Sequence, residues 1–286
     1  MGTVTAGTWP RVARLDAPRV LARIAEITGV RLVLEGPCPG GEVGAAYVRW
    51  PDGRRSVLTA GRTRSGVFVD RARSAGVPTA RHELTAHVDG VRVIVQERLP
   101  GVPPQPVTAG VVRQMLAVND KLASALDTGL GPETPPRPVP LHLTGDGPGF
   151  CLHAPLAEHS DRTRRLLARI HETGASAGHQ MIGDDLVHMD FHPGNVLVAG
   201  GRLTGVIDWD GAVRGDRFFD LVTLRFTLAG TAPDLVPLVD ERLDLLEPRR
   251  RAAYWAHMSL RMVDWAIRHH DAGAVQRWLS VAESGP

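Results

Sequence analysis

The chain has 286 residues, enough for two lobes or for one large domain with a substantial core. With 43% hydrophobic and 22% charged residues the composition is that of a soluble globular protein, and a formal net charge of only +2 provides no electrostatic footprint for nucleic acid. No stretch reaches the roughly 18 apolar residues of a membrane span, and Met1–Arg14 lacks the apolar run of a signal peptide. We therefore expect a cytoplasmic protein, monomeric or dimeric, that binds neither nucleic acid nor a membrane.

One helix and several short strands are expected in the N-terminal part of the chain. Residues 16–29 have the apolar spacing of a helix, which Asp16 can cap and Gly29 can end. Turns at Pro51-Asp52-Gly53 and at Asp89-Gly90 each separate two strand-like runs, which is a good hairpin signal. The expected strands are 31–34, 45–50, 55–59, 83–88 and 91–96. Together they predict a small antiparallel sheet.

The pattern becomes helical after a connector, Leu99–Pro106, that is rich in proline. The expected helices are 111–125, 161–173 and most of the chain after Gly230. A β-rich front half and a helical back half predict an α+β architecture with two lobes. We place the N-terminal, nucleotide-binding lobe at 1–98 and the C-terminal, catalytic and substrate-binding lobe at 99–286, with a hinge at about 96–101.

Two short apolar runs, Val196–Val198 and Gly205–Ile207, have polar residues at their ends. Asp190 and Asn195 lie on the loop before the first run, and Asp208 follows the second. A hydroxyl nucleophile needs a carboxylate to orient it and take its proton. Magnesium prefers oxygen ligands and keeps several waters, so one carboxylate and one amide oxygen suffice beside phosphates. This inventory, in the order of a kinase catalytic loop, predicts phosphoryl transfer.

Three consecutive motifs resemble those of the aminoglycoside phosphotransferase family, relatives of choline kinases and more distantly of protein kinases. His188–Asn195 matches the catalytic loop, Ile207–Asp210 the metal motif, and Gly215–Leu221 the segment that follows it. The resemblance implies a bilobal, protein-kinase-like fold and an enzyme that uses ATP (or GTP) and Mg²⁺. A cyclic-peptide antibiotic kinase of the capreomycin and viomycin kind falls within this family.

The resemblance also assigns roles to single residues. It implies that Asp190 is the catalytic base and that Asn195 and Asp208 hold magnesium. Asp220 would be structural and would brace the catalytic loop.

A weaker resemblance extends to the front half. Gly40–Tyr47 is similar to the loop that covers the nucleotide, where glycine lets backbone amides approach phosphates, although a plain hairpin loop fits the pattern as well. Val95–Gly101 resembles the hinge, whose backbone would hydrogen-bond adenine. The residues that this resemblance assigns to the nucleotide are Gly40, Gly41, Gln96, Glu97 and Leu99.

One position departs from the family pattern. Such kinases usually place a lysine on the third strand, whereas this chain has Thr59 there. The only lysine, Lys121, falls in a predicted helix beyond the hinge. Either another cation serves the phosphates, with Arg62 the first candidate, or nucleotide use is impaired. A solvated surface arginine fits Arg62 as well.

Other interpretations compete with a small-molecule kinase. A nucleotide-binding pseudoenzyme would explain the missing lysine, but the three polar residues of the site are all present. A protein kinase needs a long activation segment, and only eleven residues separate Asp208 from Asp220. His188, Asp190 and His192 could form a metal cluster, but Pro193 and Gly194 argue against a regular ligand geometry for zinc.

The resemblance suggests as acceptor a hydroxyl of a small cationic antibiotic, either an aminoglycoside or a cyclic peptide. A polycation needs carboxylates to steer and hold it. The carboxylates near the loop or on the tail helices include Asp184, Asp185, Asp210, Asp216 and Asp264. A choline-like, fructosamine-like or sugar substrate, or a macrolide, remains the alternative.

Overall fold

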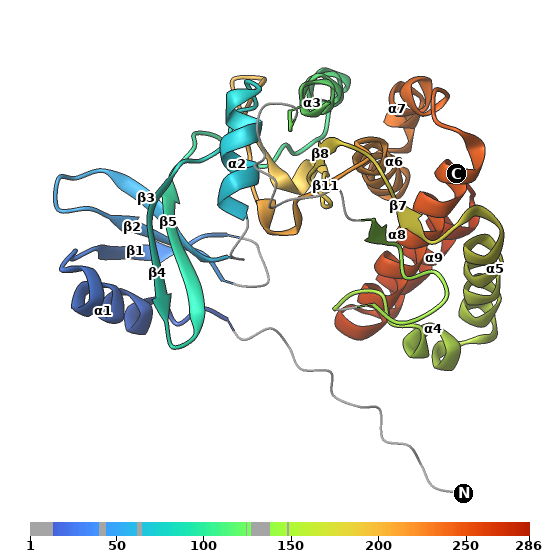
Figure 1. Ribbon diagram of the computed structural model, residues 1–286, viewed down its shortest axis with the longest axis horizontal. Coiled ribbons are helices and arrows are strands. Elements are labelled where there is room, and N and C mark those ends of the chain that lie inside the picture. Colours follow the sequence, from blue (N-terminus) through green and yellow to red (C-terminus); the bar gives the residue numbers. More distant parts are fainter. Residues whose placement is uncertain (1–13, 40–43, 62–64, 124, 127–137, 148) are drawn as a thin grey trace, which may run out of the picture. The chain divides into compact units, whose positions relative to one another are not determined.

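A computed structural model describes residues 14–39, 44–61, 65–123, 125–126, 138–147 and 149–286 (Figure 1). Its contacts divide the chain into two compact units. The first, here called the N-unit, comprises the residues up to Asp70 together with Thr79–Leu99. The second, the C-unit, comprises Arg71–Pro78 together with Pro100–Pro286. None of the described helices is long and apolar enough to span a membrane.

The N-unit contains a five-stranded antiparallel sheet and one long helix. The strands are β1 Val33–Pro37, β2 Ala46–Arg49, β3 Arg55–Ala60, β4 His82–Val88 and β5 Val91–Glu97. They pair in the order β1-β2-β3-β5-β4, so the two predicted hairpins, β2–β3 and β4–β5, are both present (Figure 1). The first strand starts later than expected, because residues 30–32 lead the chain from the preceding helix to the sheet.

Helix α1, Ala17–Thr28, forms where its local signals predict it. The Asp16 side chain accepts a hydrogen bond from the Arg19 amide (3.2 Å) at the start of the helix. Gly29 ends it with a φ of 73°, a left-handed conformation that favours glycine, and its amide donates to the Ala25 carbonyl. The apolar face of α1 packs on one face of the sheet. The core between them consists of Val20, Leu21, Ile24, Val48, Leu58, Val93 and Val95 with smaller neighbours.

The C-unit is mainly helical, with three short two-stranded ribbons. Helix α2, Ser65–Ser74, crosses the boundary between the two units. The other helices are α3 Ala109–Leu122, α4 Ala154–His159, α5 Asp161–Ala177, α6 Phe218–Thr231, α7 Val236–Leu243, α8 Pro248–His269 and α9 Ala272–Glu283. The short strands are β6 Val139–Pro140, β7 Gln180–Met181, β8 Asp185–Val187, β9 Val196–Ala199, β10 Arg202–Val206 and β11 Val213–Gly215.

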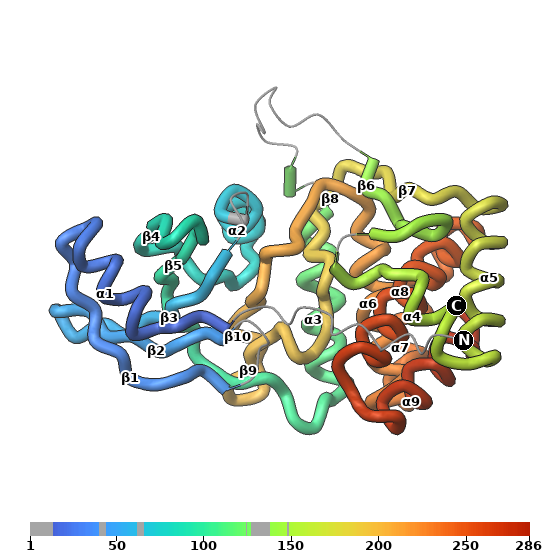
Figure 2. The backbone as a smooth tube through the Cα atoms, turned by 90° about the horizontal axis from the view of Figure 1, so that it is seen from below, coloured from blue at the N-terminus to red at the C-terminus, as the bar shows by residue number. Residues whose placement is uncertain are grey.

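Helix α8 is the centre of the C-unit. It packs against α4, α5, α6 and α9, which gather around it in two views (Figures 1 and 2). Aromatic rings fill the space between them: Phe226 of α6 lies with its ring centroid 4.8 Å from Trp255 of α8 and 5.9 Å from Trp278 of α9. Such aromatic contacts add to the burial of apolar area. A long, well-packed α8 therefore offers rigid positions for side chains.

Two of the ribbons bring the polar loops together. Strand β8 pairs with β11, and β9 pairs with β10. The loop that follows β8 leads through a short 3₁₀ turn, Pro193–Asn195, into β9. The segment after β10 leads into a second 3₁₀ turn, Trp209–Gly211. The Ile207 amide donates to the Asn195 carbonyl (2.9 Å), which fixes the two segments side by side.

Candidate active site

The loop that follows β8 is held in place by the buried carboxylate of Asp220. The backbone amides of His188 and Met189 donate to the two oxygens of Asp220, at 2.7 and 2.9 Å. Asp220 lies in the first turn of α6 and is fully buried. Burial raises the pKa of Asp220 to about 7, although the two amide hydrogen bonds lower it. The predicted bracing role of Asp220 is confirmed.

The His188 ring links this loop to the segment after β10. Its Nε2 lies 2.9 Å from the Ile207 carbonyl oxygen, and its Nδ1 lies 3.3 Å from the Asp190 amide nitrogen. Because a carbonyl only accepts and an amide only donates, Nε2 carries the proton and Nδ1 is the acceptor. Burial lowers the pKa of His188 to about 4. Both nitrogens are engaged, so His188 is no metal ligand, and the described residues contain no three-membered His, Cys, Asp or Glu metal cluster.

Asp190 lies at the tip of the loop with its side chain 32% exposed. Its Oδ1 accepts from Arg261 Nη2 (2.8 Å), and its Oδ2 accepts from Asn195 Nδ2 (3.0 Å). His192 Nε2 is 3.5 Å from the same Oδ2. Burial raises the pKa of Asp190, but the hydrogen bond from His192 and the charge of Arg261 outweigh it, so the pKa lies below its usual range. The carboxylate is therefore ionised and oriented from two sides.

Arg261 is the residue near this carboxylate that the sequence did not indicate. It projects from α8, 71 residues after Asp190 in the chain. Its Nη1 also donates to the Met189 carbonyl (2.6 Å). Nothing marks one arginine among 32 as a partner of a distant loop, so only the fold could identify it.

Asn195 and Asp208 offer oxygen atoms at the ends of adjacent segments. Asn195 uses its Nδ2 to donate to Asp190, so its Oδ1 is the atom that can face a cation. Asp208 is exposed and has a left-handed backbone, with φ 64° and ψ 60°. Desolvation of the carboxylate by neighbouring protein atoms is the largest cause that raises the pKa of Asp208, to about 6. The negative charges of Asp190 and Asp210 raise it further. A divalent cation bound there would favour the ionised carboxylate and lower its pKa again. The amide oxygen of Asn195 and the carboxylate of Asp208 are ligands of the kind that Mg²⁺ prefers.

The residues predicted to bind nucleotide are only partly described. Gly40, Gly41 and Arg62 lie outside the described residues. Gln96 and Glu97 are the last two residues of β5, and Leu99 follows in the connector. The Glu97 amide already donates to the Arg81 carbonyl (2.9 Å). The Leu99 amide is therefore the better candidate for a hydrogen bond to a base.

The third strand has threonine where a lysine was expected. Thr59 lies on β3 and is paired with Ile94 of β5. Lys121 does not take the place of the lysine, because its Nζ donates to the Gly76 carbonyl (2.8 Å) within the C-unit.

Two of the carboxylates suggested for a cationic substrate are not available to one. Asp216 is buried and pairs with Arg250 and with the Tyr254 hydroxyl (2.7 Å). Asp264 is fully buried and pairs with Arg268 Nε (2.6 Å). The expectation that these acids could contact a substrate is wrong, because their ion-pair partners come from the same helix, α8.

The remaining candidate carboxylates lie nearer the surface. Asp184 pairs with Arg214 (2.7 Å), and Asp185 accepts a hydrogen bond from the Arg217 amide (3.2 Å). Asp210 lies in the 3₁₀ turn two residues after Asp208.

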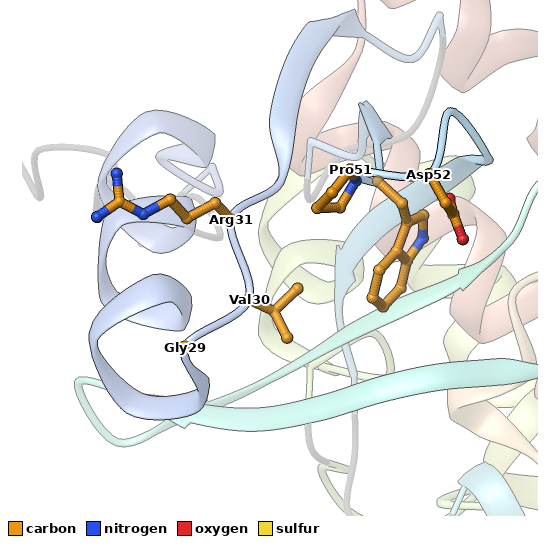
Figure 3. Close-up of a pocket in the computed structure, with 6 residues that line it drawn as sticks. Gly29, Val30, Arg31, Pro51 and Asp52 are labelled. Carbon is orange, nitrogen blue, oxygen red and sulfur yellow. The ribbon is translucent and has the colours of Figure 1, made fainter.

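A hollow of about 520 Å³ lies elsewhere, in the N-unit (Figure 3). It is formed by Gly29–Arg31, after α1, and by Trp50–Asp52, in the β2–β3 turn. None of the candidate site residues lines it, and its walls are mostly apolar. We assign it no part in the chemistry.

The C-unit geometry defines a class of protein. An oriented Asp190, the oxygen atoms of Asn195 and Asp208, and the bracing Asp220 resemble the site of a kinase-type phosphotransferase. The family model described as "Phosphotransferase enzyme family" matches residues 64–272. The chain belongs to this family and is a phosphotransferase. A search among curated proteins gave no match.

Solved structures with the same fold include antibiotic and metabolite kinases. Aminoglycoside phosphotransferase APH(4)-Ia, a thermostable mutant in a ternary complex with ADP and hygromycin B, is 19% identical, with a TM-score of 0.65 over 93% of this chain and 98% of that one. Spectinomycin phosphotransferase APH(9)-Ia, in complex with ADP and spectinomycin, is 12% identical, with a TM-score of 0.55 over 93% of each chain. A putative fructosamine-3-kinase from Haemophilus somnus 129PT is 10% identical, with a TM-score of 0.55 over 93% of this chain and 96% of that one. These similarities confirm the predicted α+β, protein-kinase-like fold.

Proposed function

We propose that this protein transfers the γ-phosphate of ATP, with Mg²⁺, to a hydroxyl of a small molecule. The observation that carries the proposal is the Asp190 carboxylate, held at Oδ1 by Arg261 and at Oδ2 by Asn195. Oδ1, which accepts from Arg261, keeps a second lone pair for an incoming hydroxyl, whereas Oδ2 also lies 3.5 Å from His192 Nε2. Asp190 would orient that hydroxyl and accept its proton as the oxygen bonds to the γ-phosphorus and the bond to the departing ADP breaks.

Asn195 and Asp208 would hold the metal through an amide and a carboxylate oxygen. The chemistry that Mg²⁺ would supply there is neutralisation of the negative charge that develops on the phosphates during transfer. The hydrogen bond between the Ile207 amide and the Asn195 carbonyl supports this proposal, because it keeps the two ligand-bearing segments adjacent. Asn195 serves twice, since its Nδ2 orients Asp190 while its Oδ1 remains for the metal.

The nucleotide would contact the backbone near Leu99 and the glycine loop at Gly40 and Gly41. Because Thr59 replaces the usual lysine, we propose that Arg62 or Arg64 grips the phosphates, as a guanidinium can do in bidentate fashion. Changing Arg62 and Arg64 to alanine should then raise the KM for ATP and leave the KM for the acceptor unchanged. An unchanged KM for ATP would remove both arginines from this role.

The first acceptor class to test is a cationic antibiotic, either an aminoglycoside or a cyclic peptide of the capreomycin and viomycin kind. The structural similarity to kinases solved with hygromycin B and with spectinomycin supports this choice. The similarity to a putative fructosamine-3-kinase supports the metabolic alternative. A macrolide is the third candidate, since the geometry at Asp190 requires only a hydroxyl.

The deciding experiment incubates the protein with ATP, Mg²⁺ and single acceptors, and measures the mass gain of one phosphate. The panel contains hygromycin B, spectinomycin, viomycin, a macrolide, choline and a fructosamine. The Asp190→Asn variant is the matched control, because it keeps the size of the side chain and removes the base. Phosphorylation of an antibiotic by the wild type alone supports resistance as the role. Phosphorylation of choline or fructosamine alone assigns a metabolic role, and no transfer at all would contradict the proposal.

A further inference from the structure

Arg261 makes two contacts to successive residues of the catalytic loop. Its Nη1 donates to the Met189 carbonyl (2.6 Å) and its Nη2 to Oδ1 of Asp190 (2.8 Å). The side chain is 20% exposed, so most of it lies within the protein. Because a guanidinium is planar and rigid, gripping two atoms at once fixes the carboxylate relative to its own backbone.

The loop conformation needs such support. Met189 has a φ of 71°, which is unfavourable for a residue with a side chain. Asp220 holds the amides on one side of the loop, and Asn195 holds the carbonyl and Oδ2 of Asp190 on another. Arg261 supplies the hydrogen bonds to the Met189 carbonyl and to Oδ1 of Asp190.

We propose that Arg261 is a positioning residue, which sets the orientation of the Asp190 carboxylate from helix α8. The inference rests on the proposed function, in which Asp190 is the base. Without Arg261, the carboxylate would still be held through Oδ2 but could rotate about that contact. Reaction geometry is sensitive to such freedom, since a displacement of about 1 Å can reduce a rate by about 10²-fold.

The position of Arg261 on α8 gives this role a wider consequence. Helix α8 packs against α4, α5, α6 and α9, so Arg261 connects the carboxylate to the core of the C-unit. Asp220, by contrast, connects the loop to α6. The catalytic loop is thus fixed to two helices of the same core. Asp220 of α6 binds its backbone amides, and Arg261 of α8 binds the Asp190 carboxylate.

The test compares Arg261→Ala and Arg261→Lys with a control on the same helix. Arg268→Lys removes the guanidinium fork from an ion pair with Asp264, seven residues farther along α8, without touching the loop. Hydrogen exchange of the peptide 186–197 is measured in each protein without ligand, together with the melting temperature. This readout does not depend on turnover, so it decides the inference even if the wild type phosphorylates none of the acceptors.

We expect exchange in peptide 186–197 to be faster in both Arg261 variants and unchanged in Arg268→Lys. With an acceptor identified by the panel, Arg261→Ala should lose about 10²-fold in kcat with little change in the KM for ATP. Added guanidinium should restore part of that loss, and Arg261→Lys should lose less. Loop exchange equal to that of the control would overturn the proposal. An unchanged kcat would also overturn it, because Arg261 would then have no effect on the reaction geometry. A kcat that rises would overturn it as well, because Arg261 would then obstruct the site.

Discussion

The buried His188 makes a contribution to stability that is lost between neutral pH and pH 5, and the raised pKa values of Asp220 and Asp208 oppose that loss. In the folded protein both ring nitrogens are already used, Nε2 as donor to the Ile207 carbonyl and Nδ1 as acceptor from the Asp190 amide. Protonation of Nδ1 would place one N–H group against another. Burial also disfavours the charged ring, because it removes the ring from water. The pKa of His188 is therefore lowered to about 4, against about 6.5 for an unfolded chain.

The sign follows from proton binding. Above about pH 6.5 the histidine is neutral in both states and contributes no pH dependence. Below it the unfolded chain binds a proton that the folded protein does not, so the free energy of unfolding falls as the pH falls. At pH 5 the loss from His188 is about 2 kcal/mol, and it approaches about 3 kcal/mol below pH 4. His257 is also buried, with its pKa lowered to about 4 by burial, and contributes in the same direction.

The assay is urea unfolding at pH 7.5 and at pH 5 of the wild type, His188→Gln and His257→Gln. Each glutamine variant removes one titrating group, so each should lose about 2 kcal/mol of the difference in unfolding free energy between the two pH values. Each variant will also be less stable at pH 7.5, which the paired measurement subtracts. If His188→Gln keeps the full pH dependence of the wild type, the assignment of a neutral, doubly hydrogen-bonded His188 is refuted.

Three further substitutions test the site. Asp190→Asn should keep the melting temperature and ATP affinity but lower kcat by roughly 10² to 10⁴, as measured by phosphate transfer; wild-type turnover would remove the base assignment. Asp208→Ala should abolish transfer and the Mg²⁺ dependence of nucleotide binding, measured by calorimetry with and without the metal; metal-dependent binding that persists would contradict its role. Asp220→Ala leaves two buried amides without an acceptor and should lower the free energy of unfolding by about 3 kcal/mol; a loss below about 0.5 kcal/mol, typical of surface positions, would contradict the bracing role.

The elements that the sequence predicted well are those with local signals. Helix α1 is bounded by the Asp16 cap and by Gly29, which directly flank it in the sequence. The hairpins β2–β3 and β4–β5 form around Asp-Gly turns. Helix ends were less accurate: α3 begins at Ala109 rather than at 111, because Thr108 caps it by accepting from the Val111 amide. A threonine cap is common in loops as well, so the sequence alone does not identify it.

The candidate site was predictable where its residues are close in the chain. Asp190, Asn195 and Asp208 lie within one short segment, and the pairing of β9 with β10 brings its ends together. The bracing by Asp220 was implied by the family resemblance of its segment. Arg261 was not predictable, because its contact with Asp190 depends on how α8 packs in the C-unit.

Whether acidic residues near the catalytic loop can contact a cationic acceptor depends on their ion-pair partners. Those partners are distant in the sequence or could not be recognised from it. From the sequence, Asp216 and Asp264 looked available to a polycation, yet the structure pairs them with Arg250 and Arg268. Releasing a buried carboxylate from its partner costs about 3–5 kcal/mol, so a substrate ammonium cannot readily replace those arginines. Arg261 of the same helix is likewise paired, with Asp190. A cationic acceptor must find its carboxylates elsewhere, and the geometry supports phosphoryl transfer more firmly than it supports a polycationic substrate.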